Sequence, residues 1–217
     1  MNDVQRAKII LKILDKTYPK IIVPLKSRNV FTLLISVLLS AQCTDVNVNN
    51  VTKKIYPKYY KPQHFKKLGR KKIEKLIKKI GIFRVKAKSI YNLSNLLIRN
   101  HNGKVPKTFE ELERLPGVGH KTASVVMSQG FGYPAFPIDT HIHRLAQRWG
   151  LTNGKNVVET EKDLKRLFPK KYWNKLHLQI IYYGREYCKA RSCYGLSCKI
   201  CTTCYPTRKK PLTTKKA

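Results

Sequence analysis

The stretch TFEELERLPGVGHKTASVVMSQG, Thr108–Gly130, says most about the fold. Thr108 is a good N-cap residue, and the glutamates that follow it favour the first turns of a helix that ends near Leu115. Pro116 stops that helix, and two nearby glycines permit a tight turn before a second helix that starts around His120. The stretch therefore predicts a helix-hairpin-helix.

The turn of this hairpin is a candidate contact with the backbone of a nucleic acid. Gly117 and Gly119 have no side chain, so a phosphate can approach the N–H groups at the start of the second helix, where the helix dipole also favours an anion. Such contacts hold the backbone and read no base sequence. The alternative is a plain Pro-Gly turn between two packed helices. The charge of the whole chain favours the phosphate contact.

The chain carries a large excess of positive charge. Its 217 residues include 45 Lys and Arg against 12 Asp and Glu, a formal net charge of +33, yet 42% of them are hydrophobic. That apolar content favours a folded body over a disordered basic arm. Between Lys53 and Lys88 there are fifteen basic residues and one acid. Any single lysine is best explained as part of a solvated helix face, but the collective excess favours a polyanionic partner, nucleic acid rather than a membrane surface.

Apolar residues recur at helical spacing along nearly the whole chain. Ile9, Ile10, Ile13 and Leu14 form one such face, and alternating strand patterns are missing. The sequence therefore predicts an all-α fold. No apolar run approaches the ~20 residues that a membrane span needs, and we find no signal peptide at the N-terminus. We expect a cytoplasmic protein whose six cysteines stay reduced.

Five of those cysteines lie in YCKARSCYGLSCKICTTCYP, residues 187–206. Four thiolates in one short loop suit a [4Fe–4S] cluster or a structural zinc ion. Cys43 stands alone beside an apolar helix, and we expect it to be a buried thiol.

The combination of motifs resembles the endonuclease III family, the bifunctional DNA glycosylases of the helix-hairpin-helix superfamily. LPGVGHKTASVV is followed by PIDTHIHRLAQRWG, with LLSAQCTD upstream and the cysteines downstream, and the similarity runs from about Ile21 to Tyr205. The resemblance implies a six-helix domain over residues 22–133 and a second domain from residues 1–21 and 134–206 that holds an iron–sulfur cluster. A cleft between the two domains would hold the active site, and residues 207–217 would form a basic tail.

Two residues match the family's catalytic positions. Lys121 matches the nucleophile, and the positive end of the helix dipole, together with burial in the cleft, would favour its neutral amine. Asp139 matches the carboxylate that stabilises positive charge on C1′ as the base leaves. Asp139 also precedes a helix that starts near Thr140, so it is a candidate N-cap, and both roles can hold together.

Further positions follow from the resemblance. Gln42 and Ile82 would fill or wedge the gap that a flipped nucleotide leaves in the duplex, although Ile82 after Gly81 could equally be a core residue. Asp45 and His141 match positions near the pocket. The residues of the hairpin expected to contact DNA are Leu115, Gly117 and Gly119.

The cysteine spacing departs from the family pattern C-x6-C-x2-C-x5-C. Cys188 and Cys204 keep the outer separation, and Cys198 with Cys201 keeps the central pair, so the expected ligands are these four. The alternative set has Cys193 in place of Cys201. A [4Fe–4S] cluster is the expected cofactor, with structural zinc as the alternative.

The expected function is excision of oxidised pyrimidines from damaged duplex DNA, with a nick 3′ to the abasic site, by a monomeric enzyme. Two alternatives remain open at this point. One is a non-catalytic DNA-binding protein that uses the hairpin and the charge alone, and the other is a monofunctional glycosylase whose Lys121 takes no part in the reaction.

Overall fold

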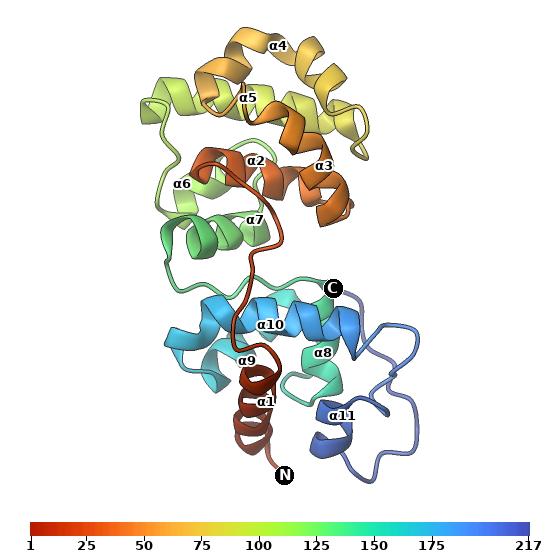
Figure 1. The fold of residues 1–217 in the computed structure, drawn as a ribbon. Coiled ribbons are helices and arrows are strands. Elements are labelled where there is room, and N and C mark those ends of the chain that lie inside the picture. The colour runs from red at the N-terminus through yellow and green to blue at the C-terminus, as the bar shows by residue number, and fades with distance from the viewer. The chain divides into compact units, whose positions relative to one another are not determined.

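The computed structural model describes all 217 residues, and its regular elements are helices without a single strand (Figure 1). The all-α prediction is therefore confirmed. The chain divides into two compact units. We call Val23–Tyr133 the hairpin unit, and Met1–Ile22 together with Pro134–Ala217 the terminal unit.

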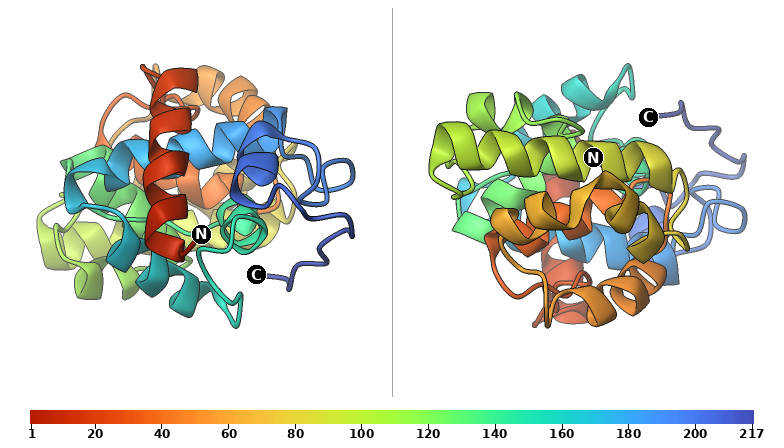
Figure 2. Two further views of the ribbon diagram at one scale, coloured as in Figure 1. Left: turned by 90° about the horizontal axis from the view of Figure 1, so that it is seen from below. Right: turned by 90° about the horizontal axis from the view of Figure 1, so that it is seen from above.

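The hairpin unit is organised around a buried helix. It contains α2 (Val30–Ser40), α3 (Asp45–Ile55), α4 (Pro62–Leu76), α5 (Phe83–His101), α6 (Phe109–Glu113), α7 (His120–Val125) and the π-helical turn η1 (Val126–Gly130). Every residue of α2 from Phe31 to Leu39 is buried, as expected for a helix that is apolar on all sides. The long helix α5 runs beside α4, which bends at Gly69 (Figure 2, right).

The terminal unit joins the two ends of the chain. It contains α1 (Asp3–Thr17), α8 (Thr140–Arg148), α9 (Val157–Leu167), the 3-10 turn η2 (Lys170–Tyr172), α10 (Trp173–Glu186) and α11 (Lys199–Cys204). Helix α1 lies across α10 (Figure 2, left), and Leu14 and Leu176 belong to one apolar core with Trp149. The cysteines of residues 188–204 are part of the same core.

The last residues of the chain are bonded to the terminal unit. Arg208 donates to the carbonyl oxygens of Arg148 (2.9 Å) and Gly195 (3.2 Å). Further along, the backbone N–H of Lys215 donates to the side chain of Gln147 at 2.8 Å. These bonds tie residues 207–217, for which the sequence predicts a basic tail, to the terminal unit. None of the helices combines the length and the apolar character needed to cross a bilayer.

Candidate functional site

The hairpin is formed by α6, α7 and the turn between them. Thr108 caps α6 by accepting a hydrogen bond from the N–H of Glu111 at 3.3 Å, as the sequence predicted. Gly117 has φ +81°, and a Cβ atom there would lie 2.9 Å from Cβ of Ser89. Both the backbone conformation and the space therefore require glycine at this position.

The start of α7 is open. Gly119 is its N-cap in extended conformation, no side chain caps the helix, and a Cβ atom at Gly119 would meet nothing within 4 Å. The first N–H groups of an α-helix have no partner inside the helix, so they can bind an external acceptor. Leu115 is buried, which leaves only its backbone to contact a ligand.

Side chains on either side of the turn hold the two helices of the hairpin together. Glu113 and Nδ1 of His120 lie 2.7 Å apart, which links the end of α6 to the first residue of α7. The ring of Phe109 stacks on that of His120 with 5.6 Å between centroids. These contacts set the direction in which α7 leaves the turn, and so the position of the next residue, Lys121.

Lys121 lies in the first turn of α7 and is exposed. The burial of this amine that the sequence predicted is therefore wrong. An exposed amine directly after a glycine turn is free to reach an electrophile on a bound ligand.

Asp139 is the N-cap of α8, as the sequence predicted. Its Oδ1 accepts a hydrogen bond from the N–H of Ile142 at 2.8 Å, and the residue is half-buried. This bond holds the carboxylate in one orientation, which suits electrostatic work at a reacting centre. Lys121 belongs to the hairpin unit and Asp139 to the terminal unit, so their sharing of one active site stays a prediction.

Gln42 and Ile82 both have left-handed backbone conformations, with φ of +53° and +49°. This conformation costs about 1–3 kcal/mol of folding free energy for a residue other than glycine, and it is especially unusual for a β-branched residue such as Ile82. Ile82 is 54% exposed, so the core alternative for this residue is wrong. The two turns lie close together, because a Cβ atom at Gly81 would be 3.6 Å from the carbonyl oxygen of Gln42. The predicted role of both residues in DNA remains untested.

The remaining predicted pocket residues lie at helix starts. Asp45 is the first residue of α3, and His141 is the second of α8; both are half-buried. Nη2 of Arg144 lies 3.4 Å from Nδ1 of His141. Cys43 is half-buried rather than buried, and its Sγ accepts a hydrogen bond from the side-chain amide of Asn47 at 3.2 Å.

Four buried thiols meet in the terminal unit. The Sγ atoms of Cys188, Cys193, Cys198 and Cys201 all lie within 4.8 Å of one another. Cys204 is buried as well but is not part of this group. The group thus differs from the expected ligand set by having Cys193 in place of Cys204. Cys204 is the last residue of α11 and lies about 4.5 Å further along the helix axis than Cys201, since each residue advances the helix by about 1.5 Å.

The chemistry of this group fits a metal centre. Cys201 lies 3.9 Å from Cys188 and from Cys193, close to the spacing of about 3.8 Å that tetrahedral bonds of ~2.3 Å to a single ion would give. Hydrogen bonds among these thiols lower the pKa of Cys198 and raise the pKa of Cys188 and Cys201, so a metal would have to displace protons from the last two. The expected ligand set itself stays a prediction.

Two buried cations were missed by the sequence analysis. Arg148 on α8 donates to the carbonyl oxygens of Lys189 (2.8 Å) and Ala190 (2.9 Å) and so holds the start of the cysteine loop. Lys86 on α5 is 4% exposed. The burial of Lys86 could have been predicted from the sequence, because its spacing places it on the same helix face as Ile90 and Leu93. A lysine on an apolar face is a signal that a specific partner is present.

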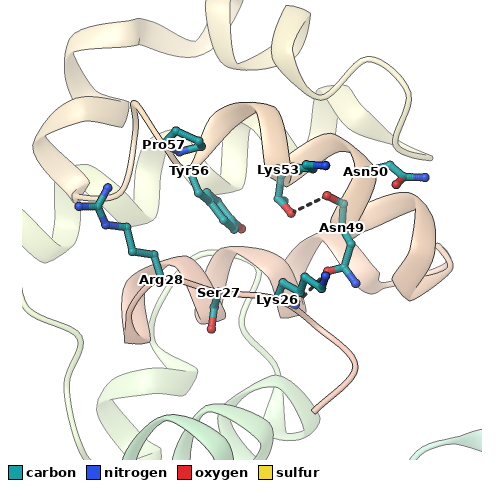
Figure 3. Close-up of a pocket in the computed structure, with 9 residues that line it drawn as sticks. Lys26, Ser27, Arg28, Asn49, Asn50, Lys53, Tyr56 and Pro57 are labelled. Carbon is teal, nitrogen blue, oxygen red and sulfur yellow. Dashed lines mark hydrogen bonds between the residues drawn. The ribbon is translucent and has the colours of Figure 1, made fainter. Parts of the chain in front are cut away.

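A cavity of about 500 Å³ lies elsewhere in the hairpin unit, between α3 and the segment before α2 (Figure 3). Its lining includes Lys26, Arg28, Lys53 and Tyr56, and Asn49 accepts a hydrogen bond there from the N–H of Lys26 at 2.9 Å. None of the predicted site residues lines this cavity. It adds three cations to the basic surface of the unit and no acid.

Comparison with known proteins places these features in a family. The sequence model of the HhH-GPD superfamily base excision DNA repair proteins matches residues 35–170. Endonuclease III of Bacillus subtilis (strain 168) is 39% identical over 211 residues, which cover 97% of this chain and 96% of that protein. The chain belongs to the endonuclease III family. Endonuclease III of Escherichia coli (strain K12) is also 39% identical, over 204 residues, 94% of this chain and 96% of that protein.

Solved structures of endonuclease III agree with this assignment. A trapped endonuclease III–DNA covalent intermediate matches with a TM-score of 0.87 and 42% identity, covering 92% of this chain and 94% of that one. A non-covalent endonuclease III–DNA complex gives the same values. A thermostable thymine-DNA glycosylase, 23% identical with a TM-score of 0.80, shares the fold. This member of the endonuclease III family is a DNA glycosylase and lyase of base excision repair, and a non-catalytic DNA-binding role is not favoured.

Proposed function

We propose that Lys121 is the nucleophile with which this endonuclease III-family enzyme removes oxidised pyrimidines from duplex DNA and cleaves at abasic sites. The observation that carries the proposal is the position of Lys121, exposed in the first turn of α7 immediately after the open glycine turn. The same turn binds a phosphate through backbone N–H groups, so the amine and the sugar are brought together. We expect a monomer to do this work.

The reaction follows from the chemistry of an amine and a deoxyribose. The neutral amine of Lys121 attacks C1′, and the bond from C1′ to the base breaks, so the base leaves with the electron pair. Opening of the sugar gives a Schiff base, which makes the protons on C2′ acidic. Loss of one of these protons breaks the bond from C3′ to its phosphate oxygen by β-elimination. Water then releases the sugar fragment from Lys121.

Asp139 supports the first of these steps. Positive charge develops on C1′ as the base departs, and a fixed carboxylate stabilises it. The carboxylate also accepts the proton that the attacking amine loses. The hydrogen bond from the N–H of Ile142 keeps Asp139 oriented while it does so.

The duplex must release the target nucleotide before Lys121 can reach it. Enzymes that act on a base flip it out of the stack at a cost of a few kcal/mol. We propose that Gln42 and Ile82, which are exposed on adjacent strained turns, fill the space that the nucleotide leaves. His141 and Asp45 are assigned to the pocket that receives the flipped base.

We also propose that the buried cysteines hold a [4Fe–4S] cluster. Cys188, Cys198 and Cys201 belong both to the set expected from the sequence and to the group that the structure brings together. These cysteines would hold the cluster, which would tie the loop into one shape. The loop residues Lys189, Arg191 and Lys199 are exposed and are thereby available to bind phosphates. A structural zinc ion is the alternative, because four thiolates also suit zinc. Iron and sulfide analysis of the purified protein distinguishes the two.

Borohydride trapping tests the assignment of Lys121. The wild-type protein, mixed with a duplex that holds one oxidised pyrimidine and then reduced, should form a covalent adduct with the DNA. Lys121→Ala should lower both the adduct and strand cleavage by at least about a thousandfold. Lys104→Ala, which removes an exposed lysine from the same unit, is the control and should react as wild type. An undiminished adduct in Lys121→Ala would remove this residue from the mechanism.

A further inference from the structure

A buried lysine ties together the two turns that carry Gln42 and Ile82. Lys86 lies on the inner face of α5, and its Nζ donates to the carbonyl oxygens of Leu39 (3.0 Å) and Ala41 (2.6 Å). These carbonyls belong to the C-terminal end of α2, where the helix dipole favours a cation. The next residue along the chain is Gln42. The bond therefore fixes the start of the Gln42 turn to the helix that begins immediately after Ile82.

A second side chain makes a parallel link. The amide nitrogen of Asn47, on α3, donates to the carbonyl oxygen of Lys79 at 3.1 Å and to Sγ of Cys43 at 3.2 Å. Lys79 lies three residues before Ile82 in the chain, and Cys43 directly follows Gln42. The two turns are thus joined from both sides, by Lys86 on one and by Asn47 on the other.

The two links explain how strained backbone persists here. A left-handed conformation of a non-glycine residue persists only where several contacts with the surrounding structure stabilise it. Such residues are concentrated at active sites and ligand-binding sites. Gln42 and Ile82 both have this conformation and are both exposed, whereas the side chain of Lys86 that links their turns is buried. Burial lowers the pKa of Lys86, and no carboxylate is bonded to it; the carbonyl oxygens of the Gln42 turn are its partners.

We propose that Lys86 is a positioning residue for base flipping. It holds the Gln42 turn and the Ile82 turn in one preset arrangement, so that both side chains enter the duplex together when the nucleotide leaves. Asn47 reinforces this arrangement from the other side. The proposal rests on the proposed function of Gln42 and Ile82, and it adds two residues that do not themselves touch the reacting atoms.

The test compares two substrates that differ in how much flipping they need. Lys86→Met removes both hydrogen bonds while keeping an apolar chain of similar length in the buried space. Single-turnover release of an oxidised pyrimidine should fall about tenfold to a hundredfold, because misplaced groups reduce rates steeply. Cleavage at a preformed abasic site, where no base has to be extruded, should fall less than about threefold. Lys104→Met, which removes an exposed charge from the same unit, should change neither rate.

A fluorescence measurement separates positioning from a general loss of structure. An abasic-site analogue that resists cleavage is placed opposite 2-aminopurine, whose fluorescence rises when it loses its stacking partners. Wild type and Lys104→Met should raise the signal on binding, and Lys86→Met should raise it by less than about half as much at saturation. Equal loss of base release and abasic-site cleavage, with the fluorescence response unchanged, would overturn the proposal.

An independent variant keeps the test decisive if Lys86→Met is unstable. Asn47→Ala removes the second link and should change the ratio of the two rates in the same direction by a smaller factor. If Asn47→Ala leaves that ratio at the wild-type value, the proposal is wrong. Failure of the proposed function is distinguishable from this result, because it would appear in the wild-type protein as the absence of any trapped adduct.

Discussion

The two units of this enzyme position their functional residues by different means. In the hairpin unit they lie on turns of unusual backbone conformation: Gln42, Ile82 and Gly117 all have positive φ, and the side chains of Lys86 and Asn47 hold the first two turns. In the terminal unit they lie at a regular helix start or in the core: Asp139 accepts a capping hydrogen bond, and the cysteines are buried. Mutations should therefore act differently in the two units.

Charge does not separate the units. The hairpin unit holds 22 Lys and Arg against five acidic residues, and the terminal unit 23 against seven. Because both are strongly basic, net charge predicts a polyanionic partner and no more. The function of this chain therefore depends on a few constrained positions rather than on its net charge.

The largest effect is expected in the cysteine loop. Cys198→Ser removes a thiol common to both ligand sets and should abolish metal binding, since bonds to structural metals contribute about 10–16 kcal/mol. Cys193→Ser and Cys204→Ser then decide between the sets. The grouping in the structure predicts that Cys193→Ser loses iron and Cys204→Ser keeps it, and the expected set predicts the reverse. Iron content and the visible absorption of each purified variant give the answer.

Next in size is the effect at Asp139. Asn is as good an N-cap as Asp, so Asp139→Asn should keep the thermal stability of wild type while base release falls about a hundredfold to a thousandfold. Asp139→Ala should lose the same activity and about 0.5–2 kcal/mol of stability as well. Full activity in Asp139→Asn would leave the residue as a cap alone. Thermal melts and single-turnover kinetics separate the two roles.

Two glycines of the hairpin should respond in opposite ways. Gly117→Ala imposes positive φ on a side chain and places Cβ 2.9 Å from Ser89, so we expect a loss of about 1–3 kcal/mol in the free energy of unfolding. Gly119→Ala has open space and an ordinary φ, and should lower the free energy of unfolding by less than about 1 kcal/mol, because alanine is a poorer N-cap than glycine. Its methyl group would stand where a phosphate approaches, so DNA affinity should fall about tenfold. Unchanged affinity in Gly119→Ala would argue against a phosphate at this turn.

The smallest effect concerns single lysines. Lys199 lies in the cysteine loop, and Lys162 is exposed on α9. If the loop binds phosphate, Lys199→Ala should reduce the slope of log affinity against log salt concentration by about one. Lys162→Ala removes the same charge from the same unit and should leave the slope unchanged. Equal slopes in both variants would mean that the loop makes no phosphate contact.

Much of the candidate site could be predicted because its short motifs contain different residue types, each with a recognisable role of its own. Thr108, Gly119 and Asp139 each have a local role that a helix start imposes, and the structure places all three at helix starts. The cysteines show the opposite case. Five chemically identical thiols within seventeen positions leave several ligand sets open, and spacing alone cannot choose among them. Which thiols meet depends on how the loop turns between Cys188 and α11.

The amino-acid sequence by itself determined the helical fold, the hairpin, the cap at Asp139 and the place of Lys121, because those features depend on interactions within one or two helical turns. Only the tertiary structure decided that Cys193 joins the thiol group, that residues 207–217 pack onto the terminal unit, and that Lys86 links the Gln42 and Ile82 turns. These contacts join residues far apart in the chain or choose among equivalent groups. The packing of the whole unit sets their energies.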